Sequence, residues 1–233
     1  MRRIISFGCG VNSVAMVIFL YDLGKRHEII FSDTGVEQPE TYCYLDMFNE
    51  WLLNRYGVGV TTVSRGESLF DYCYNNSLVP SVGFRWCTDK FKKIPIKKKT
   101  GSGVISLIGI AADEWHRAKP STQSEFPLIE NGIDRSECKD IIKRVGLEIP
   151  KKSGCYFCPF QSADEWKRLY DRHPALWEKA KNMEIKAKNA GRGMATFSTS
   201  GVTLEQLEYM FKNQLSFGFP SPPDEYMSCV CRD

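Results

Sequence analysis

The first twenty residues constrain the fold more than any other stretch, because a strand pattern passes through two glycines into a helix pattern. Residues 3–7 are mostly apolar and include two isoleucines, which predicts a buried strand. Gly8 and Gly10 give the backbone the freedom that a tight turn needs, and residues 14–20 are apolar enough for a buried helix. This stretch therefore predicts a strand, a glycine loop and a helix N-terminus.

A loop of this kind is suited to binding an anion. Backbone N–H groups and the positive end of a helix dipole point to one spot, and the Asn12 amide and Ser13 hydroxyl add donors. A phosphate or pyrophosphate suits these donors. The glycine spacing matches neither the P-loop nor the dinucleotide-binding motif, so a merely tight strand-to-helix turn is an equal alternative.

The alternation of strand and helix patterns continues along the chain. Residues 27–33 are a second predicted strand, a helical pattern follows from about residue 39 to 55, and residues 59–64 and 103–110 are further predicted strands. Their apolar runs suit a sheet covered on both faces. We therefore expect a doubly wound, mostly parallel α/β sheet of the Rossmann-like type, with ligands at the carboxyl ends of its strands.

Composition limits the location and the chemistry. The 233 residues carry a net charge of only +3, so any basic surface has to be local. No signal-peptide pattern or apolar run of membrane-spanning length is present, so we expect a cytoplasmic protein without a membrane partner. Nine cysteines, an odd number, favour metal, redox or sulfur chemistry over a disulfide framework in a reducing compartment.

The glycine loop resembles the PP-loop, SGGxDS, of the adenine nucleotide α-hydrolase superfamily, which includes ATP pyrophosphatases, tRNA and DNA thiolation enzymes and phosphoadenosine phosphosulfate (PAPS) reductases. Gly8 stands at the first serine, Cys9 and Gly10 at the two glycines, Asn12 at the aspartate and Ser13 at the final serine. Asn12 lacks the negative charge that an aspartate offers to magnesium. The resemblance implies that these residues bind the nucleotide: Ser6, Gly8, Cys9, Gly10, Val11, Asn12 and Ser13.

Two further segments resemble segments of the PAPS reductases. Residues 31–41 follow DTG-x-E-x-P-E-T, and residues 109–117 follow G-x-R-x-x-E-S-x-R with alanines where the arginine is expected. The missing arginine removes an anion contact and counts against a PAPS 3′-phosphate. An ordinary turn and helix cap is the alternative for the first segment. The resemblance adds the following residues to the expected nucleotide site: Asp33, Thr34, Gly35, Glu37, Glu114 and Arg117.

The resemblance places the chain in the PAPS reductase-like branch of the superfamily and implies three parts. Residues 1–130 are expected to form the PP-loop adenine-nucleotide-binding α/β domain, and residues 131–213 a small cysteine-rich helical region packed on it. Within that region two charged helices are expected between residues 162 and 189, with a break at His173-Pro174. Residues 214–233 are rich in proline and are expected to form a mobile tail.

The cysteines predict a metal site. Cys155 and Cys158 stand three positions apart before a proline, a spacing typical of iron–sulfur and zinc ligands, and Cys87 and Cys138 are the candidates for the other two ligands. The region around Cys87 resembles the CC-x-x-x-K-x-x-P motif of sulfonucleotide reductases, with Trp86 replacing the first cysteine. This implies a [4Fe–4S] cluster completed by Cys138; a zinc ion, or no metal, is the alternative.

Four other cysteines carry separate expectations. Cys43 and Cys73 lie in apolar helical patterns and are expected to be buried structural thiols. Cys229 and Cys231 lie in the tail and are candidates for a catalytic nucleophile or persulfide carrier. Two exposed thiols at a frayed end are the alternative for this pair.

The segment Lys90–Lys99 is the one concentrated basic stretch, with six lysines in ten residues. Its position beside Cys87 favours contact with the phosphates of a nucleotide or a polynucleotide, and a solvated helix face is the equal alternative. The candidate contacts are Arg85, Lys90, Lys92 and Lys93.

Two chemistries compete within this branch. In the first, which we prefer, ATP with Mg²⁺ adenylates a base carbonyl in tRNA or DNA, and a sulfur from a donor then displaces AMP. In the second, a tail cysteine attacks the sulfur of PAPS or adenosine phosphosulfate (APS), and a thioredoxin-type reductant resolves the product. A non-catalytic subunit that binds nucleotide or nucleic acid is the third option. A homodimer is one option for the oligomeric state.

Overall fold

The computed structural model describes residues 1–119, 121–191, 196–197 and 201–213. Its centre is a five-stranded, all-parallel sheet in the order β3-β2-β1-β4-β5. The strands are β1 (Arg2–Phe7), β2 (Glu28–Asp33), β3 (Val60–Ser64), β4 (Val104–Ile108) and β5 (Ser124–Glu125). The predicted Rossmann-like α/β fold is confirmed at this level, and the two-residue β5 is the strand that the sequence pattern did not predict.

The central strand β1 is apolar because it is covered on both faces. Ile4 and Ile5 have no exposed surface, and Ile5 pairs with Ile29 of β2 and Leu107 of β4. Strand β1 lies between β2 and β4; the chain runs from β1 through β2 to β3 in one half of the sheet and then crosses to β4 and β5 on the other side of β1. This strand order leaves a crevice at the carboxyl ends of β1 and β4, where α/β folds bind ligands.

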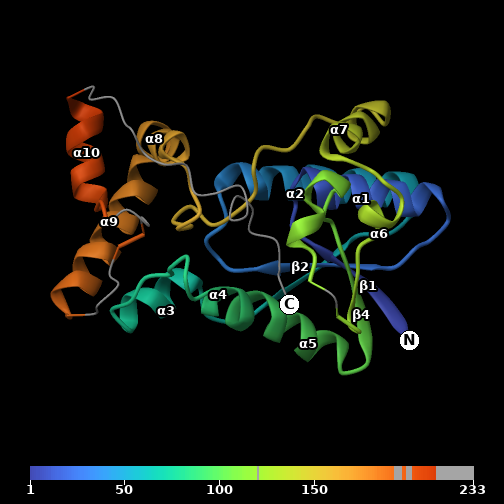
Figure 1. Ribbon diagram of the computed structural model, residues 1–233, viewed down its shortest axis with the longest axis horizontal. Coiled ribbons are helices and arrows are strands. Elements are labelled where there is room, and N and C mark those ends of the chain that lie inside the picture. Colours follow the sequence, from blue (N-terminus) through green and yellow to red (C-terminus); the bar gives the residue numbers. More distant parts are fainter. Residues whose placement is uncertain (120, 192–195, 198–200, 214–233) are drawn as a thin grey trace.

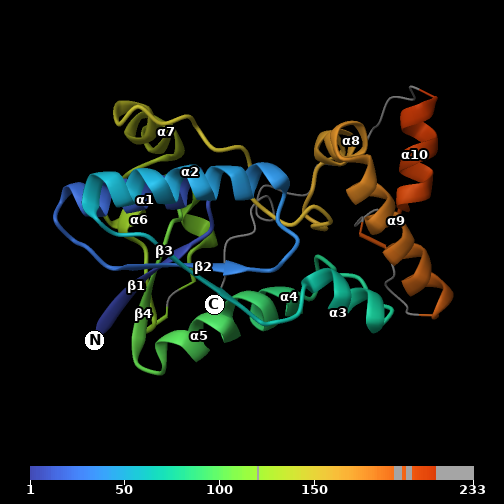
Figure 2. The ribbon, with the colours of Figure 1, turned by 180° about the vertical axis from the view of Figure 1, so that it is seen from behind.

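One face of the sheet is covered by α1 (Val11–Asp22), α2 (Pro39–Tyr56) and α7 (Arg135–Arg144) (Figures 1 and 2). Helix α1 is buried along nearly its whole length and packs between the sheet and α7, which explains its apolar sequence. The short helix α6 (Pro127–Glu130) contributes Leu128 to the core on this face. These elements and the sheet share the first hydrophobic core.

The opposite face is covered by the lysine-rich stretch in helical form. It comprises α4 (Trp86–Thr88), the π-helical turn η1 (Asp89–Lys93) and α5 (Ile94–Thr100) (Figure 2). The Ser32 hydroxyl on β2 donates a 2.7 Å hydrogen bond to the Phe91 carbonyl, and Phe91 is fully buried. This contact fixes η1 against the sheet.

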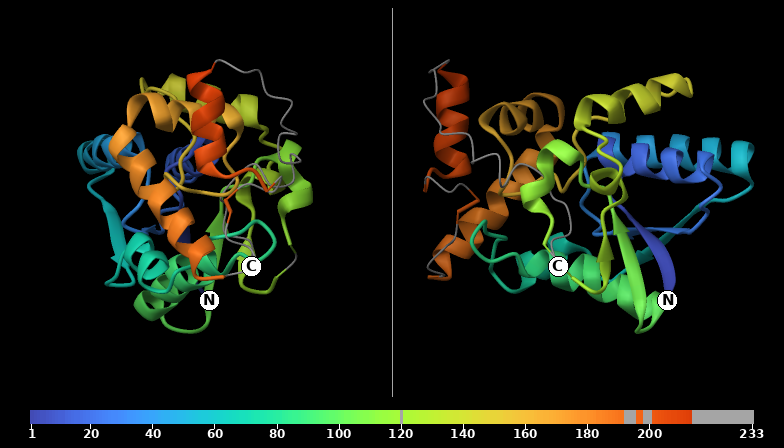
Figure 3. Two further views of the ribbon diagram at one scale, coloured as in Figure 1. Left: turned by 90° about the vertical axis from the view of Figure 1, so that its left-hand side faces the viewer. Right: turned by 45° about the vertical axis from the view of Figure 1, so that its right-hand side comes forward.

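A second lobe stands beside the sheet (Figure 3). It contains α3 (Leu69–Asn75), α8 (Ala163–Arg172), α9 (Pro174–Asn189) and α10 (Leu204–Lys212), and the predicted break between two helices at His173-Pro174 is confirmed. Its core is aromatic, and the rings of Trp166 and Trp177 meet edge to face at 6.2 Å.

The two cores do not divide the chain at residue 130. Helix α7 follows that point yet packs on α1 in the first core, whereas α3 precedes it and belongs to the second. The expected tail, residues 214–233, lies outside the described residues. Within the described parts of the chain, no helix has both the length and the apolar character needed to cross a lipid bilayer.

Candidate functional site

The glycine loop connects β1 to α1 at the carboxyl edge of the sheet. Gly10 is the N-cap of α1, and its N–H donates to the Ser13 hydroxyl at 3.1 Å while that hydroxyl donates to the Gly10 carbonyl at 3.0 Å. A Cβ on Gly10 would come within 2.9 Å of the Ser153 hydroxyl, so the loop lies against the segment that precedes the CxxC turn. Ser13 thus stabilises the loop itself as well as facing the crevice.

Cys9 occupies the strained position of the loop. Its φ of 56° lies in the left-handed region that favours glycine. The side chain is 1% exposed and its thiol donates to the Thr41 carbonyl at 3.6 Å. Burial raises the pKa of this thiol to about 12, so Cys9 is a neutral structural group.

Asn12 lies at the centre of a polar network formed by residues far apart in sequence. Its amide donates to Glu114 Oε2 at 2.7 Å, and Glu114 Oε1 lies 2.8 Å from Nη1 of the buried Arg117. On the other side, Arg135 Nη1 donates to Asn12 Oδ1 at 3.3 Å. Glu114 and Arg117 come from the 3₁₀ helix η2 (Ala112–Arg117) after β4, and Arg135 begins α7. The structure therefore joins three predicted site residues and adds Arg135.

A cavity opens over the glycine loop. One wall is apolar and contains Phe7, Phe31, Ile96 and Ile108. Three cations from separate elements line it as well: Lys92, Arg135 and Lys152. Among the predicted nucleotide-binding residues, those that line it are Ser6, Gly8, Gly10, Val11, Asn12 and Ser13. We call this space the loop cavity.

The segment from Asp33 to Glu37 lies beside the loop cavity and does not line it. Asp33 Oδ1 accepts hydrogen bonds from the Gly35 N–H at 2.8 Å and the Tyr42 hydroxyl at 2.7 Å, which is the behaviour of a turn-forming aspartate. Burial and the bond to Asp33 raise the pKa of Tyr42 above its ordinary value. The Thr34 hydroxyl donates to the buried Glu37 carboxylate at 2.9 Å.

A second, smaller cavity is lined by three of the four predicted metal ligands: Cys87, Cys155 and Cys158. Thr34 also lines it, with its hydroxyl oxygen 3.5 Å from the Cys155 sulfur. The CxxC turn is held there by backbone pairing, because Tyr156 N–H donates to the Val36 carbonyl at 2.9 Å. We call this space the cysteine cavity.

Cys138, the predicted fourth ligand, is not brought to the cysteine cavity. It is fully buried on α7 in the first core, and burial raises its pKa to about 12. Within the described residues, no three cysteine, histidine or carboxylate side chains are disposed to hold a metal ion. Cys73 is buried as expected, but Cys43 is exposed, so that expectation was wrong. Cys229 and Cys231 lie outside the described residues.

Lys92 lines both the loop cavity and the cysteine cavity. Its Nζ lies 3.8 Å from Glu37 Oε1, with side-chain exposures of 14% and 2%. Because Thr34 bonds the same Glu37 oxygen and approaches Cys155, a short chain of polar contacts runs from Lys92 to the Cys155 sulfur. The neighbouring Lys93 has a different partner: its Nζ lies 3.3 Å from Asp89 Oδ1, one helical turn away.

Two further predicted cations contact aromatic rings. The Arg85 guanidinium lies over the Phe160 ring at 5.0 Å, and Lys90 donates to the Tyr72 hydroxyl at 2.5 Å. Both contacts lie in or beside the second core and hold α4 and η1 against it. Of the four predicted phosphate contacts, Lys92 is the one among the described residues that lines the loop cavity.

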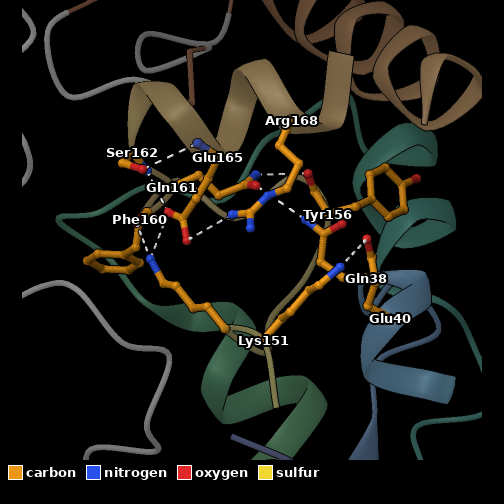
Figure 4. Close-up of polar contacts among 10 residues, drawn as sticks. Gln38, Glu40, Lys151, Tyr156, Phe160, Gln161, Ser162, Glu165 and Arg168 are labelled. Carbon is orange, nitrogen blue, oxygen red and sulfur yellow. Dashed lines mark hydrogen bonds and ion pairs between the residues drawn. The ribbon is translucent and has the colours of Figure 1, made fainter. Parts of the chain in front are cut away.

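Lys152, like Arg135, is a cation that the sequence motifs did not single out, and it belongs to a polar network beside the CxxC turn, of which Figure 4 shows Glu165 and Arg168. Its Nζ lies 2.8 Å from Glu165 Oε2, and Arg168 reaches the other Glu165 oxygen at 3.9 Å. Gln161 donates to the Tyr156 carbonyl at 2.8 Å, which closes the turn. This network fixes the segment with Lys152 and Ser153, which lines one side of the loop cavity.

Comparison with known proteins shows distant likeness and no assigned role. No family model matches the chain. The chain is 26% identical over 200 residues to the uncharacterized protein MJ0066 of Methanocaldococcus jannaschii, over 77% of this chain and 40% of the relative. It is 24% identical over 192 residues to the uncharacterized protein MJ0973 of the same organism, over 75% of this chain and 45% of the relative. The chain thus spans less than half the length of the curated relatives it matches.

Proposed function

We propose that this protein is an adenine-nucleotide-dependent enzyme of sulfur chemistry, of the PP-loop and PAPS reductase-like type. The observation that carries the proposal is the position of Lys92, which lines both the loop cavity and the cysteine cavity. A cationic cavity at the carboxyl ends of parallel strands suits a nucleotide, and a neighbouring group of thiols suits sulfur transfer. One shared side chain allows the two sites to act on the same reacting group.

In the proposed complex the nucleotide spans the loop cavity. Its phosphates lie against the backbone N–H groups of the loop and the start of α1, with Lys92, Arg135 and Lys152 around them. The adenine ring packs on the apolar wall that contains Phe31 and Ile96. The fixed donors and cations stabilise the charge that develops on the phosphates during reaction.

The preferred reaction is ATP-dependent sulfur transfer to a nucleic-acid base. The carbonyl oxygen of the base attacks the α-phosphorus of ATP, the bond to the β-phosphate oxygen breaks, and pyrophosphate leaves. A sulfur nucleophile then attacks the activated carbon, the C–O bond breaks, and AMP leaves with the former carbonyl oxygen. The cysteine cavity supplies or positions that sulfur, and Cys229 or Cys231 remains a proposed carrier of it.

We also propose that Cys87, Cys155 and Cys158 bind a [4Fe–4S] cluster, with zinc as the alternative. All three line one cavity, and three protein ligands with an open position are typical of reactive metal sites. The thiols would have to turn inward together to hold it, since the described side chains are not disposed to do so as they stand. Such a group would link the CxxC turn to Cys87 of α4 and add to the stability of this region.

A second candidate function is the reduction of a sulfonucleotide. One observation favours it: none of the described residues that line the loop cavity is an aspartate or glutamate. Cleavage of ATP at its α-phosphorus usually relies on Mg²⁺, which carboxylates help to hold, whereas attack by a thiolate on the sulfur of PAPS or APS does not. In that reaction the S–O bond breaks as the S–S bond of an enzyme thiosulfonate forms, and a dithiol reductant then releases sulfite.

Product analysis separates these functions. The full chain, purified without oxygen, is incubated with ATP and Mg²⁺ in one series and with PAPS or APS in another, each with and without bulk tRNA and DNA. AMP and pyrophosphate that appear only with a nucleic acid support the preferred function and identify the acceptor class. Sulfite from PAPS or APS in the presence of a dithiol supports the second function. The absence of every product, with nucleotide bound, would contradict both and leave a binding subunit.

A further inference from the structure

The polar groups around Asn12 leave no suitable place for a magnesium ion. Mg²⁺ prefers carboxylate and water oxygens in regular octahedral geometry. Asn12 has a neutral oxygen, and that oxygen accepts a hydrogen bond from Arg135 Nη1 at 3.3 Å, so a cationic guanidinium stands beside it. A cation bound at the Asn12 oxygen would be repelled by the adjacent Arg135 guanidinium.

Glu114 does not compensate for the missing aspartate. One of its oxygens accepts from the Asn12 amide at 2.7 Å and the other lies 2.8 Å from Arg117 Nη1. The Arg117 side chain is only 3% exposed, so this pair is held in a weakly screened setting and the Glu114 charge is already neutralised. The described lining of the loop cavity contains three cations and neither aspartate nor glutamate.

We propose that this protein binds its nucleotide as the free anion, with the Arg135 guanidinium in the role that a Mg²⁺ ion at the loop aspartate would otherwise have. The inference rests on the proposed function, because it specifies the ionic form of the same ligand, and it favours the second candidate reaction, which does not rely on Mg²⁺. Lys92 and Lys152 each have a carboxylate partner, Glu37 at 3.8 Å and Glu165 at 2.8 Å. Among the described residues no carboxylate pairs with the Arg135 side chain, so its charge is the one most available to a phosphate.

The position of Arg135 is well defined by its helix. Asp134 caps α7 by accepting from the Glu137 N–H at 2.8 Å, and Glu137 accepts from the Asp134 N–H at 2.9 Å. The Arg135 N–H donates to Asp113 at 3.1 Å, which ties the start of α7 to η2. Buried residues of α7 anchor the helix on α1, so Arg135 is presented to the loop cavity from a rigid element. A planar guanidinium held in this way suits bidentate binding of a phosphate.

Equilibrium titration of the full chain with ATP, and separately with PAPS, in EDTA and in excess Mg²⁺ tests the inference. The wild type is expected to bind at least one of the two nucleotides no more weakly in EDTA than in Mg²⁺. Arg135→Ala should weaken that binding about tenfold to a hundredfold in both conditions, the usual effect of removing a charged hydrogen-bonding partner, and Arg135→Lys should weaken it less. Arg144→Ala, on the same helix and paired with Asp22 at the surface, is the matched control and should bind as the wild type does.

The Asn12→Asp variant gives an independent readout. An aspartate there would pair with Arg135 and repel Glu114, so binding should weaken in EDTA and become stronger when Mg²⁺ is added. Wild-type binding that needs Mg²⁺ would overturn the inference and leave the proposed function intact, and so would an Arg135→Ala protein that is folded by circular dichroism and binds normally. If the wild type bound neither nucleotide in either condition, the proposed function itself would fail.

Discussion

Gly109 lies directly against Ser13, because a Cβ placed on Gly109 would come within 2.9 Å of both the backbone nitrogen and the Cα of Ser13. Gly109 follows β4, and Ser13 is in the first turn of α1. The absence of a side chain at Gly109 therefore allows the helix N-terminus to approach the carboxyl end of β4, and this approach forms the floor of the crevice above the glycine loop.

Gly109→Ala should displace the first turn of α1. The new methyl group meets backbone atoms that cannot move aside cheaply, so we expect a loss of about 1–3 kcal/mol in unfolding free energy, as in other overpacked sites. Nucleotide binding, measured by titration calorimetry, should fall by more than tenfold. Gly83→Ala is the control, because a Cβ at Gly83 has no neighbour within 4 Å among the described atoms. Normal nucleotide affinity in a stably folded Gly109→Ala protein would show that the loop does not bind the ligand.

Lys92→Met should abolish turnover, and because it removes the cation beside the buried Glu37 carboxylate it should also lower the free energy of unfolding. The substitution keeps an apolar stem of similar length but removes the charge that faces both cavities. We expect product formation to fall at least about a hundredfold, since a positioned charge commonly contributes that much to a transition state. Lys97→Met, at an exposed position of the same basic stretch, should react at the wild-type rate. Equal rates for the two variants would remove Lys92 from the mechanism.

Cys155→Ser and Cys158→Ser should each lower the metal content of protein purified without oxygen, measured as iron and zinc per chain. Both residues line the cysteine cavity, and a bound metal or cluster adds to the stability of the region that holds it, so the variants should also unfold at lower temperature. Cys43→Ser, at an exposed thiol, should retain the metal. Metal at the wild-type level in both cavity variants would contradict the proposed ligand set.

Glu184 should make the second lobe sensitive to pH. The side chain is 1% exposed and accepts hydrogen bonds from the N–H groups of Phe197 at 3.0 Å and Leu204 at 2.6 Å. Burial raises the pKa of this carboxyl from 4.5 to about 6 despite those two bonds. A raised pKa in the folded state favours the protonated form, so its contribution to stability is present below pH 4.5 and is lost as the pH rises through about 6.

The Glu184→Gln variant measures this effect. The wild type should lose about 2 kcal/mol of unfolding free energy relative to the variant between pH 4.5 and pH 7.5, from the size of the pKa change. Denaturant unfolding at both pH values gives the difference, and Glu50→Gln, at an exposed position on α2, should show no such change. A constant difference between wild type and the Glu184→Gln variant at the two pH values would mean that Glu184 has an ordinary pKa in the folded protein.

The sequence predicted the features that depend on local pattern. The run from Ile4 to Phe7, the glycines and the apolar start of α1 specify a strand, a turn and a helix within one short stretch, and the structure has all three. The break between α8 and α9 at Pro174 was equally predictable, because proline restricts the residue before it. These are short-range effects of backbone sterics and hydrophobic periodicity.

Arg135 and Lys152 could not be placed in this way, since each reaches the loop cavity through a fold that brings distant segments together. Cys138 shows the opposite error. Its residue type predicts a metal ligand, although Cys138, Ile141 and Ile142 form the apolar stripe by which α7 packs on α1. The spacing of that stripe is the ordinary signal of a core position. Cys138 therefore lies in the first core, where α7 buries it, whereas the other three thiols lie in or beside the second core.

Lys92 lines both the loop cavity and the cysteine cavity, and this position bears on any reactive intermediate of the proposed reaction. An acyl-phosphate-like adenylate decays in water, and an enzyme that released it between two active sites would waste nucleotide. In the proposed reaction the activated species would form beside the side chain that also lines the cysteine cavity, so sulfur transfer would need no release of that species into solvent.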